Sequence, residues 1–137
     1  MTRRLLILLG IGVLCSGPQY ALASDYEKML ARSFSQFCSL WMSKLDQREE
    51  RNQKIAKAAQ NGSGVVLEYT AYADSPESCE VKSVGSNGAM VGHIVYHELV
   101  VQKHGATREK ARRSKESVVG RTEVMEIFRF DGKAWLY

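Results

Sequence analysis

Large apolar side chains recur at helical spacing between residues 26 and 45. The steps between them are four, four, three, four and four residues, which is the period of one face of an α-helix. The members of this stripe are Tyr26, Leu30, Phe34, Phe37, Trp41 and Leu45. A helix with a stripe this wide must bury it against a second layer, so the rest of the chain has to supply that layer.

The ends of this helix can be predicted from the flanking residues. Ser24 and Glu27 form the pattern of a capping box, so we expect the helix to begin at Ser24. Residues 46–57 are mostly polar but keep a helix-forming composition, and Asn61 followed by Gly62 is a stop signal. We therefore predict one long helix over residues 24–60.

From residue 64 onward, β-branched and aromatic residues are separated by turn signals, which is typical of strands. We predict strands over the ranges 65–73, 79–84, 89–102, 118–130 and 133–137. The turns are expected at 74–76, at 85–88 and at the pair Asp131 and Gly132, with Gly92 as a candidate bulge. One helix followed by four or five antiparallel strands predicts a single α+β domain over residues 24–137, with the helix on a curved sheet.

Residues 1–23 show the three zones of a secretory signal peptide. Arg3 and Arg4 give a cationic start, residues 5–15 form an apolar core, and residues 21–23 form a small-x-small cleavage site. We expect cleavage after Ala23 and export to a periplasm or to the outside of the cell. The apolar core is shorter than the roughly 18 residues that a membrane-spanning helix needs, so no integral membrane span is predicted.

One alternative to cleavage and two variants of the signal peptide stay open at this point. The segment could remain uncleaved as an interfacial or buried helix. Cys15 could carry a lipid, although the bulky Leu14 before it disfavours a lipoprotein. Arg3 and Arg4 could belong to a twin-arginine signal, although the charged region is short and the apolar core is strongly hydrophobic.

Cleavage would remove Cys15 and leave Cys38 and Cys79. In an oxidising compartment, two cysteines by default form one disulfide. Cys38 flanks the helical stripe and Cys79 begins a predicted strand, so the bond would join the helix to the sheet. The alternative is two separate buried thiols.

Positive charge concentrates between residues 103 and 121. Removing Arg3 and Arg4 would lower the formal net charge from +4 to +2. The remaining excess of positive charge is concentrated in a segment that we call the basic arm. The basic arm consists of Lys103, Arg108, Lys110, Arg112, Arg113, Lys115 and Arg121. No stacking aromatic residue lies within it, so nucleic acid is not an expected partner. It is either a solvated, flexible connection between strands or a docking arm for an anionic partner, such as an anionic envelope component or an acidic protein.

Motifs for catalysis or metal binding are lacking. His93 and His97 are four residues apart, which on a strand is about 13 Å and too far for both to bind one ion. The sequence contains no nucleophile elbow, phosphate-binding loop or paired-carboxylate spacing. We therefore predict no catalytic residue, no metal and no cofactor. A pocket between helix and sheet would draw first on Tyr69, His93 and Tyr96.

The layout of a long helix on a curved antiparallel sheet, closed by a hairpin at residues 126–135, resembles the cystatin-like and nuclear-transport-factor-2-like superfolds. The short interval between residues 60 and 65 leaves little room for the extra helices of the second type, which favours a cystatin-like layout. These superfolds include enzymes, ligand carriers, protease inhibitors and assembly subunits, so the resemblance implies no single activity.

The last long strand is apolar on both of its faces. Phe128 and Phe130 share one face and Met125 and Ile127 share the other, and the helix can cover only one of them. We expect a partner protein or a second copy of the chain to cover the other. The predicted function is an exported, non-catalytic binding or accessory protein, with strand addition at the 133–137 edge as a second mode. The alternatives are a small-molecule carrier or enzyme with a pocket between helix and sheet, and an assembly subunit of an envelope or secretion complex.

Overall fold

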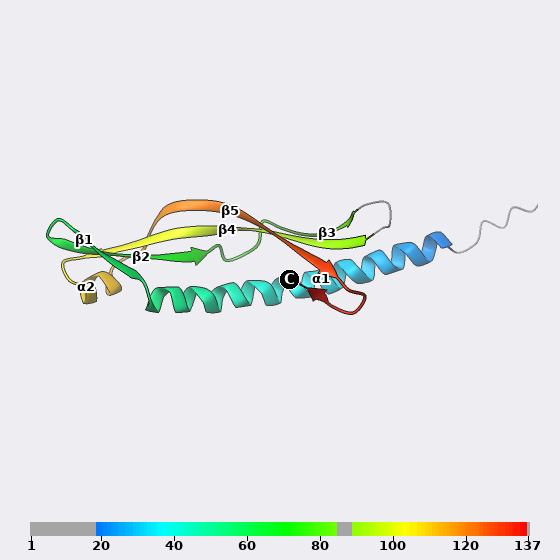
Figure 1. Ribbon diagram of the computed structural model, residues 1–137, viewed down its shortest axis with the longest axis horizontal. Helices are drawn as coiled ribbons and strands as arrows, with labels where there is room; N and C mark the ends of the chain where they lie inside the picture. The colour runs from blue at the N-terminus through cyan, green and yellow to red at the C-terminus, as the bar shows by residue number, and fades with distance from the viewer. Residues whose placement is uncertain (1–18, 85–88, 137) are drawn as a thin grey trace, which may run out of the picture.

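The computed structural model describes residues 19–84 and 89–136, and it confirms the α+β fold (Figure 1). One long helix packs on a curled antiparallel sheet, and a second, short helix lies at one end. In chain order the elements are α1 (Gln19–Lys54), β1 (Lys57–Asn61), β2 (Gly64–Tyr72), β3 (Ser78–Val84), β4 (Ala89–Gly105), α2 (Arg108–Arg113), β5 (Ser117–Phe130) and β6 (Trp135–Leu136). No helix among the described residues is long and apolar enough to cross a membrane.

The apolar stripe of α1 forms the centre of the core, as its spacing predicts. Leu30, Phe34 and Leu45 are almost completely buried, and Cys38, Trp41 and Met42 lie beside them. Tyr26 was wrongly included in the stripe because about half of its side chain is exposed. The helix begins at Gln19, five residues before the predicted start at Ser24.

The predicted end of the helix at residue 60 is wrong. Helix α1 ends at Lys54, and β1 follows as an edge strand paired with β2. Residues 46–57 carry no apolar stripe that helical packing would bury, and Gly62 adopts a φ of 60° in the two-residue turn that joins β1 to β2. Ala56 turns inward just after the helix and is buried.

Strand β4 is the centre of the sheet. Strand β5 pairs along one side of it, and the other side is shared end to end by β2 and β3. The chain leaves the sheet between β2 and β3, but two backbone bonds, from Ala73 N to His97 O and from Glu77 N to Val95 O, hold both sides of this excursion to β4. Strands β2 and β3 therefore act as one long strand with a bulged insertion at residues 74–76, where the sequence predicts a turn.

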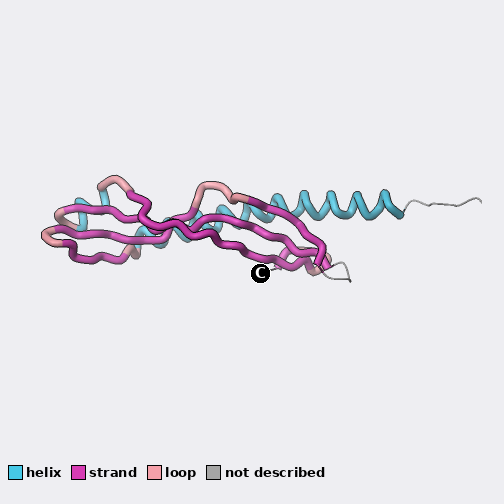
Figure 2. The backbone as a smooth tube through the Cα atoms, turned by 90° about the horizontal axis from the view of Figure 1, so that it is seen from above, coloured by secondary structure: helices cyan, strands magenta, loops and turns pink. Residues whose placement is uncertain are grey.

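The buried face of β4 changes side along the strand. Near its beginning, Ile94 and Tyr96 pack into a first core cluster with α1, whereas nearer its end Leu99 and Val101 pack into a second cluster. Successive strand residues point to opposite faces, so these two pairs lie on opposite faces of one strand. The strong twist of the sheet, visible where the strands cross in Figure 2, is what permits the switch.

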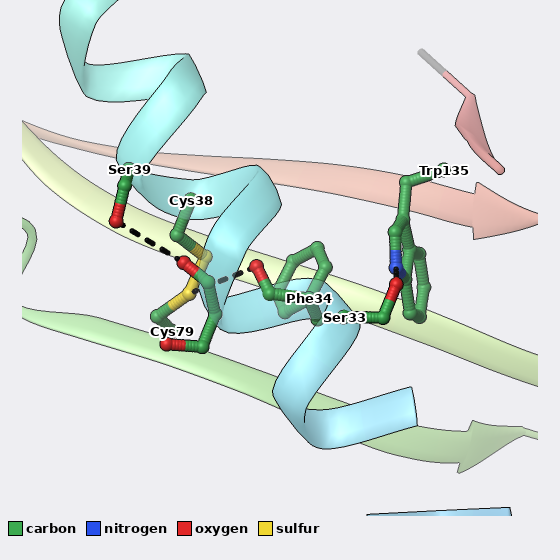
Figure 3. The surroundings of a disulfide bond; sticks show 7 residues. Ser33, Phe34, Cys38, Ser39, Cys79 and Trp135 are labelled. Carbon is green, nitrogen blue, oxygen red and sulfur yellow. Dashed lines mark hydrogen bonds between the residues drawn. A yellow bond between two sulfur atoms is a disulfide. The ribbon is translucent and has the colours of Figure 1, made fainter. Parts of the chain in front are cut away.

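The disulfide between Cys38 and Cys79 joins α1 to β3, as predicted, with 6.5 Å between the two Cα atoms (Figure 3). Aromatic rings pack around it in the first core cluster. Phe34 lies 4.5 Å from Trp135 between ring centroids, and the indole nitrogen of Trp135 donates a hydrogen bond to Ser33 Oγ at 3.2 Å. The two-residue strand β6 is thereby held to the helix, although it pairs only with the end of β5.

Three smaller predictions need correction. Gly92 is not a bulge, because the register of β4 runs regularly through it; the irregularity lies at Val119, opposite Val100 and Val101. The last turn uses residues 131–134 rather than two residues, since Asp131 Oδ1 accepts hydrogen bonds from the backbone of both Lys133 and Ala134. The sheet has six strands because β1 was not foreseen. The predicted turn at 85–88 lies outside the described residues.

Candidate interaction surfaces

The sheet face directed away from α1 carries a broad apolar surface. Residues directly opposite one another on neighbouring strands share a face, so the register of β3, β4 and β5 defines three rows across the sheet. We call these rows the outer face: Glu80, His93 and Ile127; Ser78, Val95 and Met125; Lys82, Val91 and Arg129. Met125 is 54% exposed and Ile127 is 57% exposed, so both stand free on this surface.

The outer face has charges at its margin and one unsatisfied polar atom within it. Lys82 and Glu80 form an ion pair at 3.2 Å on β3, and Arg129 stands on β5 in the row of Lys82. The Nδ1 atom of His93 is buried and has no hydrogen-bond partner among the described residues. An apolar centre with a charged margin is a composition that many protein interaction surfaces share.

A second group lies beside the excursion between β2 and β3. His97 Nε2 stands 3.5 Å from Glu77 Oε2, and Arg121 Nη2 stands 3.0 Å from His97 Nδ1. Glu123 is the cross-strand neighbour of His97, and ligand atoms of Glu77, His97 and Glu123 lie within 4.8 Å of one another. Sequence reasoning missed this grouping because Glu77 lies in the excursion just before β3, and no local pattern shows that the excursion brings it to His97.

The contact with Arg121 limits what this group can do. A guanidinium can only donate, so neutral His97 must accept at Nδ1 and carry its proton at Nε2, the nitrogen that lies 3.5 Å from Glu77 Oε2. A metal ion would need that nitrogen free of its proton. The arrangement therefore suits a network of hydrogen bonds and ion pairs that holds the β3 end of the excursion to β4 and β5.

The basic arm is folded rather than a flexible connection, which corrects that expectation. Residues Arg108–Arg113 form α2, whose N-terminus is capped by Thr107 Oγ1 accepting from Lys110 N at 3.3 Å. Ala111 is completely buried against the β2–β4 end of the sheet, and Gly105 allows this approach because a Cβ there would collide with the backbone at Ala111. The other side chains of α2 are exposed.

Lys103 of the basic arm belongs to a partly buried network of polar side chains. Lys103 Nζ lies 3.3 Å from Glu116 Oε1, and the hydroxyl of Tyr69 donates to the same oxygen at 2.7 Å. The hydrogen bond from Tyr69 and then the contacts with Lys103 lower the pKa of Glu116, while burial and the neighbouring carboxylate raise the pKa of Tyr69. These contacts tie the segment after α2 to β2 and β4.

An open hollow of about 580 Å³ lies between the end of α1, the β2–β4 end of the sheet and α2. Its floor is apolar, with Ala56 and Leu67, and its rim carries the cations Lys54, Lys103 and Arg112. Glu50 and Gln53 complete the lining. This is where the structure places a hollow between helix and sheet.

None of the three residues suggested for a pocket lines this hollow, although Tyr69 lines a smaller one, of about 200 Å³, beside the end of α1. Tyr96 is in the first core cluster, where its hydroxyl lies 3.3 Å from Glu126 Oε1. Tyr69 is in the second core cluster, and His93 belongs to the outer face on the opposite side of β4 from Tyr96. The structure therefore distributes the three residues over three environments.

Comparisons with known proteins leave the chain without an assigned relative. No family model matches it, and neither a curated protein nor a solved structure shows a significant match. The functional argument therefore rests on the surfaces described above.

Proposed function

We propose that this protein is an exported, non-catalytic binding protein whose outer face docks on another envelope or secreted protein. The observation that carries the proposal is the exposure of Met125 and Ile127 on the β5 side of a sheet face that nothing in the described chain covers. Apolar surfaces of this kind on small proteins mark interaction sites. The outer face has the apolar centre and charged margin that such sites share.

Export is part of the proposal. The disulfide between Cys38 and Cys79 is compatible with an extracytoplasmic location, where such bonds persist. Together with the signal-peptide pattern of residues 1–23, it supports a periplasmic or secreted protein cleaved after Ala23. Among known layouts, the cystatin-like one suits the chain better than the nuclear-transport-factor-2-like one, because β1 occupies the place where extra helices would follow α1.

Site-specific photo-crosslinking tests the outer face directly. A photoreactive amino acid replaces Ile127 in one variant and Leu40 in the control; Leu40 is 65% exposed but lies on α1. Both variants are produced and exported in the native host before crosslinking. We expect the Ile127 variant to crosslink to one other protein and the Leu40 variant to give no such product. An Ile127→Lys substitution should abolish binding to the captured protein, with Leu40→Lys as its control.

Two results would contradict docking at the outer face. One is the same set of crosslinked products from the Ile127 and Leu40 positions, because that pattern reports random encounters. The other is crosslinking of the Ile127 position only to a second copy of this chain. In that case the outer face would be a contact between copies rather than a site for another protein.

We propose a steering role for the basic arm in the same encounter. Helix α2 lies at the opposite end of the sheet from β3 (Figure 1), so its charges act at a distance and mainly on the association rate. Neutralising Arg108, Arg112 and Arg113 together should lower the association rate severalfold at low salt and leave the dissociation rate unchanged. An unaltered salt dependence of the association rate would argue that the arm takes no part.

A small anionic ligand is the second candidate, and the hollow beside α2 favours it. The cations Lys54, Lys103 and Arg112 line the hollow together with the apolar Ala56 and Leu67, which suits an anion with an attached apolar group. Titration with octyl phosphate, followed by NMR shifts at Leu67, tests this role. Saturating shifts that vanish in Arg112→Gln would support the hollow as a site, and their absence at millimolar ligand would remove it.

A further inference from the structure

Strand β5 has a long open edge. On one side it pairs with β4 along nearly its whole length, but on the other side only Arg129 and Phe130 pair, with β6. Within the described residues, positions 117–127 therefore present one row of backbone N–H and C=O groups that no strand satisfies. The other open edges, on β1 and β3, are shorter. Such an edge is a template for pairing with another strand.

The side chains of this edge include neither proline nor lysine, two residues that commonly block pairing. The segment contains no proline, and four of its apolar residues are at least half exposed. These residues are Val118, Val119, Met125 and Ile127. Natural proteins commonly block edges with proline, clusters of lysine or a covering helix. The exposed apolar residues on β5 instead favour occupation of the edge by a further strand.

We propose that the occupant is β5 of a second copy of this chain, paired antiparallel about a two-fold axis at Thr122. A two-fold axis perpendicular to the sheet keeps the same face outward in both copies, so each residue meets one of equal parity in the other copy. Centred on Thr122, the register places Gly120 opposite Val124 and Arg121 opposite Glu123. The sheet then continues from one copy into the next.

Charge complementarity selects this register. Arg121 and Glu123 lie on either side of Thr122, so the two-fold axis generates two opposite-charge pairs across the junction. A register centred on Arg121 would oppose two arginines, and one centred on Glu123 would oppose two glutamates. Neither residue forms an ion pair within the described chain; Arg121 reaches only the ring of His97. Neither charge is therefore neutralised by an opposite charge of the described chain, although both side chains lie beside His97.

The bulge at Val119 limits the length of the pairing. The register of β5 with β4 is regular from residue 120 onward, so the regular junction covers residues 120–124 of each copy. Just outside it, the exposed Val119 of one copy approaches the exposed Met125 of the other. The two outer faces lie on the same side of the joined sheet, so dimerisation doubles the surface that includes Ile127. This inference concerns the edge of β5 and does not depend on which protein the outer face binds.

Disulfide trapping tests the register. At the two-fold axis, the two copies of residue 122 stand about 4.5–5.5 Å apart between Cα atoms, within reach of a disulfide. We expect Thr122→Cys, in a Cys15→Ser background, to form a covalent dimer under mild oxidation. The control is Ser83→Cys, which is equally exposed but lies on the β3 edge. Dimer from both variants at the same rate, or from neither, would overturn the proposed junction.

Charge exchange provides the second test and does not depend on new cysteines. Arg121→Glu should lower the dimer fraction in sedimentation velocity at least tenfold, because it opposes two glutamates across each pair. The double variant Arg121→Glu with Glu123→Arg should restore the dimer, because each pair across the junction again joins one glutamate to one arginine. Circular dichroism confirms that the variants stay folded. Failure of the double variant to restore the dimer, or a wild-type chain that is monomeric at millimolar concentration, would overturn the proposal.

Discussion

The ring of Phe34 occupies the space that a side chain at Gly92 would fill. The glycine belongs to β4 and the phenylalanine to α1, so this contact sets how closely the helix approaches the sheet. Phe34 is almost completely buried and packs at a tilted angle against Trp135 and Phe128, so it has little freedom to move aside. The closeness of the two layers at this point depends on the missing Cβ.

Gly92→Ala should therefore destabilise the protein. A Cβ at this position collides with the Phe34 ring, and overpacking of this kind costs about 1–3 kcal/mol. The free energy of unfolding in urea measures the effect. A double-mutant cycle with Phe34→Leu is the control: the combined variant should lose less than the sum of the single losses. Strict additivity of the two losses would show that the two sites do not interact.

Removing the disulfide should cost more. The bond joins residues 41 positions apart, and closing a loop of that length contributes up to about 4 kcal/mol in the chain-entropy model. We expect Cys38→Ala combined with Cys79→Ala to lower the free energy of unfolding by an amount of this order, and reducing agent to destabilise wild type but not the variant. Mass spectrometry of exported protein that finds two free thiols would contradict the bond itself.

The carboxyl of Glu116 should titrate below the usual pKa of 4.5. The hydrogen bond from Tyr69 is the main cause, and the contacts with Lys103 add to it. Because the pKa is lowered in the folded state, the stabilisation is present above pH 4.5 and is lost as the pH falls through the folded-state value. In NMR titrations, Tyr69→Phe should raise the pKa of Glu116 more than Lys103→Met does. An unchanged pKa in Tyr69→Phe would contradict this assignment.

The turn before β6 should depend on Asp131. Its carboxylate accepts backbone hydrogen bonds from Lys133 at 2.8 Å and from Ala134 at 2.7 Å, which also lower its pKa. Asp131→Ala should lower the melting temperature and increase the solvent exposure of Trp135, measured by its fluorescence. Asp131→Asn is the matched control, because its side-chain oxygen can still accept. Equal melting temperatures for the two variants would show that the turn does not need an acceptor there.

The elements that could be predicted are those with a strong local pattern. The helical stripe of α1 and the alternating strands carry their periods in the sequence, and the disulfide followed from cysteine number and placement. Strand β1 could not be predicted because its five residues are all exposed and have no apolar pattern. Helix α2 was missed because it buries only Ala111, and one small residue gives no periodic signal.

The candidate surfaces were only partly visible in the sequence. Alternation along β5 was enough to place Met125 and Ile127 on the face away from the helix, and the structure shows both exposed. The open edge was predicted at residues 133–137, whereas the longer one lies along β5, because β6 is only two residues long. The meeting of Glu77 with His97 depends on how the chain returns after the bulged excursion, which no local pattern encodes.

Because the buried face of β4 changes side, the molecule has two cores on one continuous strand. The disulfide and most aromatic rings belong to the first, while the second holds smaller side chains such as Ala71 and Ala111. Cooperative unfolding requires that both cores open together, yet the two clusters have no residue in common. The end around α2 can therefore open on its own, with faster amide hydrogen exchange, while the cross-linked end stays closed.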